Sequence, residues 1–294
     1  MKRPLTLFLS SGRSGTQWVA KVCSELYSDL AEVVHEPIEF HYRPKLTLRT
    51  NAYEKMRREV PEIRAHLEHI AEVLESGKAY VETGWPVFSW IPYFHEKYGR
   101  QLRLVHLTRH PIYFACSLAT HEFYQPNLKN DGFTQYTQLE PTDQGIAHKE
   151  YQRMWAGLSP HEKCLFQWLE IHTYAFELQE TYPEVPFLRL RMEDLFDPDQ
   201  KSSEELIRFL EFPLDRFSEH AARERVVDKY HRKTIADFAP QKMQNHTEVT
   251  RLAERLGYDV RDYDLSKIQE RYSARTYRWL IKTLWSYFPK QRPS

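Results

Sequence analysis

The sequence predicts an α/β fold in which helices flank a central parallel sheet, built as one domain over residues 1–294 with a helical C-terminal region. Short apolar segments with strand character alternate with segments of helical periodicity, an order typical of parallel strands joined by helical crossovers. Apolar residues make up 41% of the chain, which is enough for a large core. No repeat, low-complexity tract or linker divides the sequence.

The expected strands are short apolar runs bounded by small, polar or proline residues. The first ends at a loop of small residues, and the second ends at Glu36-Pro37. The full set of expected strands is Leu5–Leu9, 31–35, 78–82, Leu102–Thr108 and Phe187–Arg191.

The expected helices lie between these strands. Residues 53–75 place Ile63, Leu67 and Ile70 on one face, and Gly77 closes this helix. Pro111 opens another helix as its first-turn residue. The full set of expected helices is 17–23, 53–75, 87–98, a helix that begins at Pro111, Pro160–Thr181 and 203–211.

Two segments depart from this alternation. Residues 124–158 lack periodicity and contain Pro126 and Pro141, which is typical of a lid or a substrate loop. Residues 267–294 are basic and aromatic and are expected to form a helix. Such a stripe favours packing on the domain or on a second subunit in a homodimer, and it is also compatible with peripheral contact to a membrane surface.

Composition and charge argue against several classes of function. The formal net charge is +0, which is unlike a nucleic-acid-binding domain. The cysteines, Cys23, Cys116 and Cys164, are far apart and lack metal-ligand spacing. We therefore expect a cytoplasmic protein with neither a disulfide framework nor a bound metal. The sequence contains no run of about 18 apolar residues, so no transmembrane span is expected.

The beginning of the chain predicts an anion-binding site. A buried strand is followed by the loop Ser10-Ser-Gly-Arg-Ser-Gly-Thr16 and then by a helix. Backbone N–H groups of such a loop and the helix dipole both favour a phosphate or sulfate group. The loop lacks the first glycine and the lysine of the Walker nucleotide loop. Arg13 lies inside the loop instead, where its guanidinium could bind two oxygens of the anion.

Other residues of this loop have two interpretations. Thr16 could cap the helix or bind an oxyanion, and Trp18 could offer a flat face to a base. The alternative is a plain strand–turn–helix with a capping threonine and a core tryptophan.

The fourth expected strand supplies a second cation. Arg109 follows that strand, and Ser117 lies two turns into the next helix. In a doubly wound sheet, ligands bind at the carboxyl ends of the strands, so this site and Arg13 would open onto the same crevice. Two cationic sites indicate a ligand with two separated anionic groups. The alternative is a surface arginine and a serine bonded to its own helix.

Together these residues resemble the sulfotransferases that use 3′-phosphoadenosine 5′-phosphosulfate (PAPS). Gly12-Arg-Ser-Gly-Thr-Gln-Trp18 is similar to that family's 5′-phosphosulfate loop, and Arg109-His-Pro111 with Ser117 is similar to its 3′-phosphate motif. Arg191-Met-Glu-Asp-Leu195 and Leu256-Gly-Tyr258 resemble its later motifs, so the similarity runs from about Leu5 to Tyr258.

The resemblance implies a P-loop NTPase-like sulfotransferase architecture. The implied activity is transfer of a sulfuryl group from PAPS, without a metal, to a hydroxyl or amine of a small-molecule, lipid or carbohydrate acceptor. The implied donor-binding residues are Arg13, Ser14, Gly15, Thr16, Gln17, Trp18, Arg109 and Ser117. Arg13 would also be catalytic, because it would stabilise the bridging oxygen as the S–O bond breaks.

The chain departs from the family at the catalytic base. Many members have a histidine after the third strand, and Gly84 occupies that position here. Other branches use a carboxylate shortly after the second strand, where this chain has Glu36, so Glu36 is the first candidate for the base, followed by His35 and then Glu82. The alternative for Glu36 is a strand-end carboxylate paired with a nearby arginine. Arg232-Lys233 is only faintly similar to a late family motif and receives no role.

Two other functions remain as alternatives. One is a nucleotide or small-molecule kinase of related P-loop fold, against which the missing Walker lysine argues. The other is a non-catalytic module that binds 3′,5′-adenosine bisphosphate, an alternative kept by the absence of the family histidine at Gly84.

Overall fold

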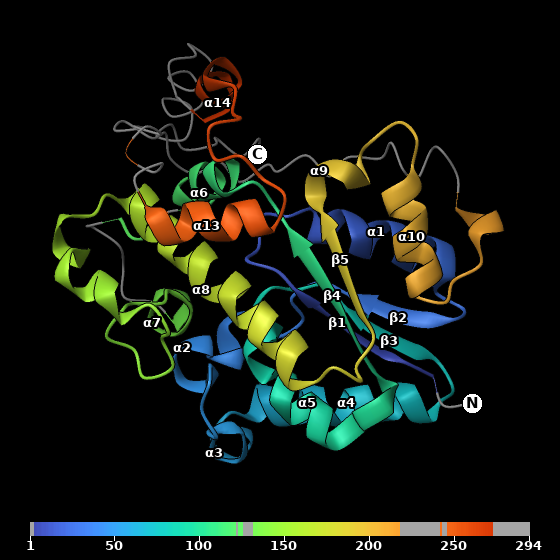
Figure 1. Ribbon diagram of the computed structural model, residues 1–294. Coiled ribbons are helices and arrows are strands. Elements are labelled where there is room, and N and C mark those ends of the chain that lie inside the picture. Colours follow the sequence, from blue (N-terminus) through green and yellow to red (C-terminus); the bar gives the residue numbers. More distant parts are fainter. Residues whose placement is uncertain (1–2, 122, 126–131, 218–241, 243–245, 273–294) are drawn as a thin grey trace, which may run out of the picture.

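A five-stranded parallel sheet forms the centre of the structure, which is a computed structural model (Figure 1). The structure describes residues 3–121, 123–125, 132–217, 242 and 246–272. The strands are β1 (Leu5–Leu9), β2 (Ala31–Val34), β3 (Ala79–Glu82), β4 (Leu102–Thr108) and β5 (Phe187–Arg191). Their order is β2-β3-β1-β4-β5, and every neighbouring pair is parallel. The predicted strands and their parallel arrangement are confirmed.

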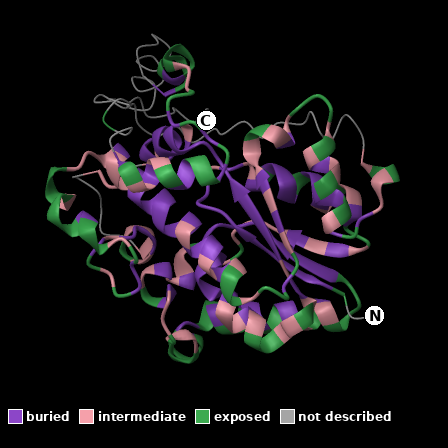
Figure 2. Ribbon diagram, in the orientation of Figure 1, coloured by how far each residue is buried: buried purple, intermediate pink, exposed green. Residues whose placement is uncertain are grey.

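Successive side chains of the strands pack on opposite faces of the sheet, as the geometry of a β-strand requires. On β1, Leu5 and Leu7 join the core on one face, while Phe8 joins the core on the other. On β4, Leu104 and Leu107 divide in the same way. Both faces of the sheet are therefore buried, and Figure 2 shows the central strands in the colour of buried residues.

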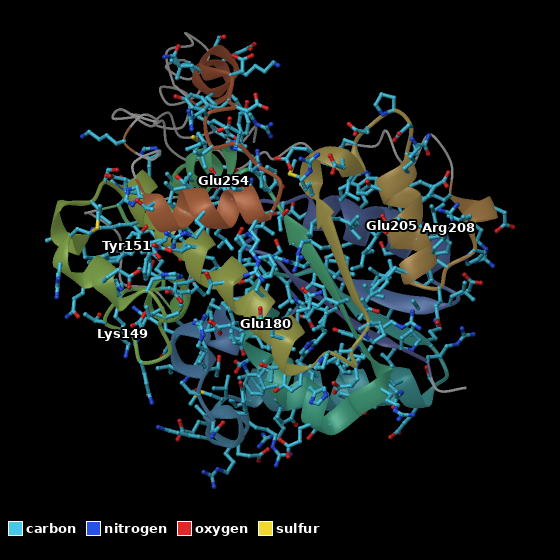
Figure 3. All side chains as sticks on the ribbon, in the orientation of Figure 1. Lys149, Tyr151, Glu180, Glu205, Arg208 and Glu254 are labelled. Atoms are coloured by element: carbon cyan, nitrogen blue, oxygen red, sulfur yellow. The ribbon has the colours of Figure 1, made fainter. Side chains whose placement is uncertain are left out.

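Helices cover both faces. One face carries α1 (Thr16–Tyr27) and α10 (Lys201–Phe209), with the short α9 (Met192–Leu195) after β5. The other carries α4 (Pro61–Glu75), α5 (Ile91–Tyr98), α6 (Pro111–Ala119), α8 (Pro160–Thr181), α13 (Thr247–Arg255) and α14 (Leu265–Tyr272). Figure 3 marks the two layers, with Glu205 and Arg208 on α10 and Glu180 and Glu254 on α8 and α13. No helix in the described part of the chain combines the length and the apolar composition that crossing a membrane requires.

Prolines divide two segments that the sequence predicts as single helices. Residues 53–75 form α3 (Tyr53–Glu59) and α4, because Pro61 has no N–H to continue the first helix and forces Val60 into an extended conformation with φ −117° and ψ 97°. Residues 87–98 begin as the 3-10 helix η2 (Pro86–Trp90) and continue as α5. A single helix over either range is therefore wrong.

The segment 124–158 contains more regular structure than predicted. Its described part includes α7 (Gly132–Thr137) and the 3-10 helices η4 (Lys149–Arg153) and η5 (Trp155–Gly157), whereas residues 126–131 lie outside the described residues.

An arginine fastens this segment to α8. Arg49 binds both carboxylate oxygens of Glu177, at 2.6 and 2.9 Å, and one oxygen of Glu170 at 3.0 Å. Glu170 is fully buried and also accepts hydrogen bonds from the backbone N–H groups of Ala147 and His148.

Only the first residues of the predicted C-terminal helix are described. They belong to α14, which ends at Tyr272 in the described chain, and residues 273–294 lie outside it. Before α5, the chain also forms two short elements without a prediction, η1 (Glu39–Tyr42) and α2 (Pro44–Thr47).

Candidate functional site

The site lies at the carboxyl ends of the strands, where the loops after β1, β2, β3 and β4 meet. Because these strands are parallel and neighbouring, their outgoing loops share one edge of the sheet. These loops carry Arg13, Glu36, Gly84 and Arg109, so residues that are up to 96 positions apart in sequence can contact one another.

Left-handed backbone conformations shape the β1–α1 loop. Gly12, Arg13 and Gly15 have φ values of 83°, 56° and 83°. Two hydrogen bonds hold the loop: Gly12 N–H donates to Ser10 Oγ at 3.0 Å, and Ser14 Oγ donates to the Gly12 carbonyl at 2.8 Å. Residues in such conformations turn successive N–H groups toward one point, which is the basis of backbone anion sites.

The start of α1 offers donors to an anion. Gly15 is the N-cap, and no side chain caps the helix. Thr16 is the first helical residue, so the capping interpretation of Thr16 is wrong. The backbone N–H groups of Ser14, Gly15, Thr16 and Gln17 donate to no group in the described part of the chain. These are the donors that a phosphate or sulfate at a helix N-terminus uses.

The two predicted cationic sites are in direct contact. Arg13 Nε donates to Ser117 Oγ at 3.0 Å, and Arg109 Nη1 donates to the Arg13 carbonyl at 2.7 Å. Arg109 is only 6% exposed, so it is not an arginine of a surface turn. The hydroxyl of Ser117 bonds to Arg13 across the site and not to its own helix. The alternative interpretations of Arg109 and Ser117 are therefore wrong.

Electrostatics favour an anion between these groups. Burial, and after it the nearby charge of Arg109, lower the pKa of Arg13 to about 10. Two buried guanidinium groups repel each other, and a bound anion would relieve both the repulsion and the cost of burial.

The turn after β4 is held by residues of the two later motifs. Glu193 Oε1 accepts a hydrogen bond from His110 N–H at 3.0 Å, and Glu193 Oε2 accepts one from Tyr258 O–H at 3.0 Å. The ring of His110 bonds to the Asp259 carbonyl at 2.8 Å through Nε2. The sequence regions 191–195 and 256–258 thus fix the backbone that carries Arg109.

Glu36 lies beside Arg13 with a partly buried carboxyl group. Its side chain is 24% exposed, and its backbone has a left-handed φ of 49°. Burial raises the pKa of Glu36 to about 7, although a hydrogen bond from the Trp85 backbone and the charge of Arg13 act in the opposite direction. A carboxyl group with a pKa near neutrality can accept a proton from a reacting group.

The space at residue 84, after β3, is too small for a histidine. A Cβ atom at residue 84 would lie 2.7 Å from Glu36 Cγ and 2.8 Å from Glu36 N. Real Cβ atoms do not approach so closely, so Glu36 occupies the space that any larger side chain at residue 84 would need. The absence of a histidine at residue 84 and the position of Glu36 therefore have the same cause, which is the close approach of the two residues.

The other two candidates for the base lie in different surroundings. His35 contacts Thr83 Oγ1 at 3.2 Å, and burial together with the charge of Arg13 lowers the pKa of His35 to about 4. Glu82 is fully buried and accepts hydrogen bonds from Tyr42 O–H at 2.9 Å and from His66 at 3.0 Å. Of the three candidates, Glu36 combines partial exposure with a pKa near 7.

The remaining predicted donor-site residues lie on α1 or outside the described chain. Gln17 is exposed, whereas Trp18 is 3% exposed and packs edge-to-face on Phe196 with ring centroids 5.1 Å apart. Arg232 and Lys233 lie outside the described residues. Within the described chain, no group of three or more His, Cys, Asp or Glu side chains could hold a metal ion.

Sulfotransferases are among the solved structures with a similar fold. The sulfotransferase from Alicyclobacillus acidocaldarius superposes with a TM-score of 0.50 at 12% identity, covering 92% of this chain and 100% of that one. The chain has the sulfotransferase fold.

Two further sulfotransferase domains match less well, at TM-scores of 0.47. The domain of the Synechococcus PCC 7002 olefin synthase is 17% identical and covers 88% of this chain and 97% of its own. The domain from the curacin biosynthetic pathway is 15% identical, and the match covers 87% of this chain and 98% of that domain. No protein-family model and no curated protein matches the sequence.

Within this sulfotransferase fold, a chain of hydrogen-bonded side chains that no pattern in the sequence signals runs from Arg189 to Ser11 in the β1–α1 loop. Arg189 Nε donates to His106 Nδ1 at 3.0 Å, His106 Nε2 contacts His172 Nδ1 at 2.7 Å, and His172 Nε2 contacts Ser11 Oγ at 3.2 Å. The guanidinium of Arg189 can only donate, so His106 Nδ1 accepts. In each neutral imidazole the other ring nitrogen then carries the hydrogen and donates toward Ser11. Burial lowers the pKa of His106 far below its usual value and that of His172 to about 3, so both rings stay neutral.

Proposed function

We propose that this protein is a PAPS-dependent sulfotransferase that transfers a sulfuryl group to a hydroxyl or amine of a small-molecule, lipid or carbohydrate acceptor. The observation that carries the proposal is the contact between Arg13, Arg109 and Ser117 beside a carboxyl group, Glu36, whose pKa is near 7. The sulfotransferase fold supports the type of transfer.

PAPS has anionic groups at two positions. The site has a separate set of hydrogen-bonding and cationic groups for each of them. The N–H groups at the start of α1 and the guanidinium of Arg13 suit the 5′-phosphosulfate. Arg109 and Ser117 suit the 3′-phosphate, and binding that phosphate would fix the position of the donor relative to Glu36.

In the proposed step, the acceptor oxygen attacks sulfur while the bond between sulfur and the bridging oxygen of the 5′-phosphate breaks. The carboxylate of Glu36 takes the proton from the acceptor hydroxyl. The leaving group is 3′,5′-adenosine bisphosphate, and Arg13 with the loop N–H groups neutralises the charge that develops on its oxygen. All atoms are then accounted for in the sulfated acceptor, the bisphosphate and the protonated carboxyl group.

Calorimetric titration separates this proposal from the two alternatives. We expect 3′,5′-adenosine bisphosphate to bind and ATP to bind much more weakly, whereas a kinase would prefer ATP. Incubation with sulfur-labelled PAPS and a panel of hydroxyl and amine acceptors then tests catalysis. Binding of the bisphosphate without transfer to any acceptor would favour a non-catalytic module, and preference for ATP would contradict the proposal.

The two arginines are expected to have different roles. Arg13→Ala should lower kcat by about 100-fold or more, because it removes charge stabilisation that grows during bond breaking. Arg109→Ala should mainly raise KM for PAPS. Steady-state kinetics with varied PAPS measures both parameters, and equal changes of kcat and KM in the two variants would contradict this division.

A further inference from the structure

The end of α14 lies against the two arginines of the site. Arg109 Nη2 donates to Tyr272 O–H at 3.3 Å, and Tyr272 is only 4% exposed. The guanidinium of Arg271, the preceding residue, lies 5.6 Å from the centroid of the Tyr272 ring, and its charge lowers the pKa of the Arg13 guanidinium. A helix more than 160 residues after Arg109 in sequence therefore contributes to the surroundings of both guanidinium groups.

Resting on the proposed function, we infer that α14 completes the donor site, with Tyr272 as a positioning residue for Arg109 and Arg271 as a third cation for the second phosphate. No motif in the sequence assigns either residue a role. The inference follows from the contacts around Arg109.

The guanidinium of Arg109 is held on two sides. Its Nη1 binds the Arg13 carbonyl and its Nη2 binds the phenol oxygen of Tyr272. These contacts use two of the five N–H donors of a guanidinium and fix the plane of the group. The other donors then have a defined direction toward a phosphate, which is the geometric advantage of a bidentate arginine.

The position of α14 is itself fixed by the body of the fold. The backbone N–H of Asp264, just before the helix, donates to Tyr113 O–H on α6 at 2.9 Å. Ile268 and Tyr272 are buried in the main core. Since Tyr113 and Ser117 both lie on α6, this helix connects α14 with the residue that contacts Arg13.

The charge balance indicates an anionic ligand at this place. Arg13, Arg109 and Arg271 bring like charges together, and one carboxyl group that acts on Arg13, Glu36, has a pKa near 7 that leaves it partly neutral. A dianionic phosphate between the guanidinium groups would be attracted by all of them.

Comparing two nucleotides tests the inference. The affinities of 3′,5′-adenosine bisphosphate and adenosine 5′-monophosphate are measured by calorimetry for the full chain and for Tyr272→Phe and Arg271→Gln. We expect each substitution to weaken binding of the bisphosphate by about tenfold or more, as loss of one hydrogen bond to a charged group does. The affinity of the monophosphate should stay within about twofold, because that ligand lacks the second phosphate.

Two matched controls exclude general effects of the substitutions. Tyr98→Phe removes a buried hydroxyl that has no hydrogen-bond partner among the described residues. Arg251→Gln removes a guanidinium that is 68% exposed and paired with Glu248. Both should bind the two nucleotides as the natural chain does.

The outcomes distinguish this inference from the proposed function. If the natural chain binds neither nucleotide, the proposed function fails. The inference alone is overturned if the natural chain binds the bisphosphate but Tyr272→Phe and Arg271→Gln leave its affinity unchanged or raise it. The same holds if the two substitutions lower the affinity for both nucleotides equally, because α14 then does not complete the site.

Discussion

At the carboxyl end of the sheet, residue 84 lies against both the backbone and the side chain of Glu36, so a side chain at residue 84 has no room. Glu36 fills the space, and its pKa near 7 allows it to be ionised in part of the molecules at neutral pH. Arg13 lies close enough to lower that pKa, so the proposed base and the proposed charge-stabilising group act on each other.

Glu36→Gln should abolish most transfer while preserving binding of the bisphosphate. The amide keeps the size of the side chain but cannot accept the acceptor proton, and general-base catalysis accounts for about 10²–10⁴-fold in rate. Single-turnover transfer from labelled PAPS measures the loss. Glu205→Gln, which changes an exposed carboxyl group on α10, is the control. Near-normal turnover in Glu36→Gln would remove Glu36 as the base.

Gly84→Ala should also impair transfer, although alanine has no reactive group. The added methyl would meet Glu36 Cγ and the Glu36 backbone, so Glu36 has to move or the loop has to shift. We expect at least a tenfold fall in kcat and a loss of about 1–3 kcal/mol in unfolding free energy. Gly157→Ala is the matched control, because a Cβ there meets nothing within 4 Å. Full activity in Gly84→Ala would show that the close approach is without consequence.

The sequence predicts the residues of the site better than their contacts. Arg13 and Arg109 can be placed together because each follows a strand, and Ser117 joins them because it lies on the helix that follows Arg109. The contact of Gly84 with Glu36 depends on the φ of 49° at Glu36, a conformation that non-glycine residues seldom adopt and that no local pattern signals. The histidines below Ser11 are hidden for a similar reason, since they look like core residues of β4 and α8.

At the scale of elements, the turn between β4 and α6 depends on a carboxylate from the chain after β5. Glu193 accepts hydrogen bonds from His110 N–H and Tyr258 O–H and so connects three segments. The resemblance to a family motif identifies this region, but sequence alone does not show that it supports Arg109.

Glu193→Ala should weaken both folding and donor binding. Loss of the acceptor leaves the buried N–H of His110 without its partner, at a cost of about 1–2 kcal/mol. The freed turn should lower the affinity for the bisphosphate by several-fold. Thermal unfolding and calorimetry measure the two effects, with Glu204→Ala, an exposed carboxylate paired with Arg208, as the control. An unchanged affinity would show that the turn holds Arg109 without Glu193.

Element boundaries can be predicted where a local signal in the sequence, such as a capping residue or a proline, sets them. The helix Pro160–Thr181 has the predicted limits because Pro160 begins it and the capping box of Ser159 and Glu162 closes its first turn. The break at Pro61 was missed because apolar periodicity continues across it, although a proline inside a helical pattern is itself the signal.

At the scale of the whole molecule, the site has a measurable effect on stability. The folded protein raises the pKa of Glu36 from 4.5 to about 7, so between these pH values the folded state binds more protons at this residue than the unfolded state. The stability contributed by the neutral carboxyl group is complete below pH 4.5 and is lost as the pH rises through about 7.

Comparing the natural chain with Glu36→Gln isolates this contribution. Glutamine stays neutral, so the variant should become more stable than the natural chain, by about 1–3 kcal/mol, as the pH is raised from 5 to 8. Denaturant unfolding at several pH values measures the difference. A difference that is constant with pH would show that Glu36 has an ordinary pKa.

The close approach of Gly84 to Glu36 also has a consequence for evolution. A side chain at residue 84 would meet the backbone nitrogen and Cα of residue 36 whichever side chain residue 36 carries. If Glu36 is the base, exchanging a carboxylate for an imidazole at this edge needs a shift of the backbone at residue 36 as well as the two substitutions. Lineages with different bases are then separated by a barrier that single substitutions do not cross, and sequence comparisons should weigh the two positions as a pair.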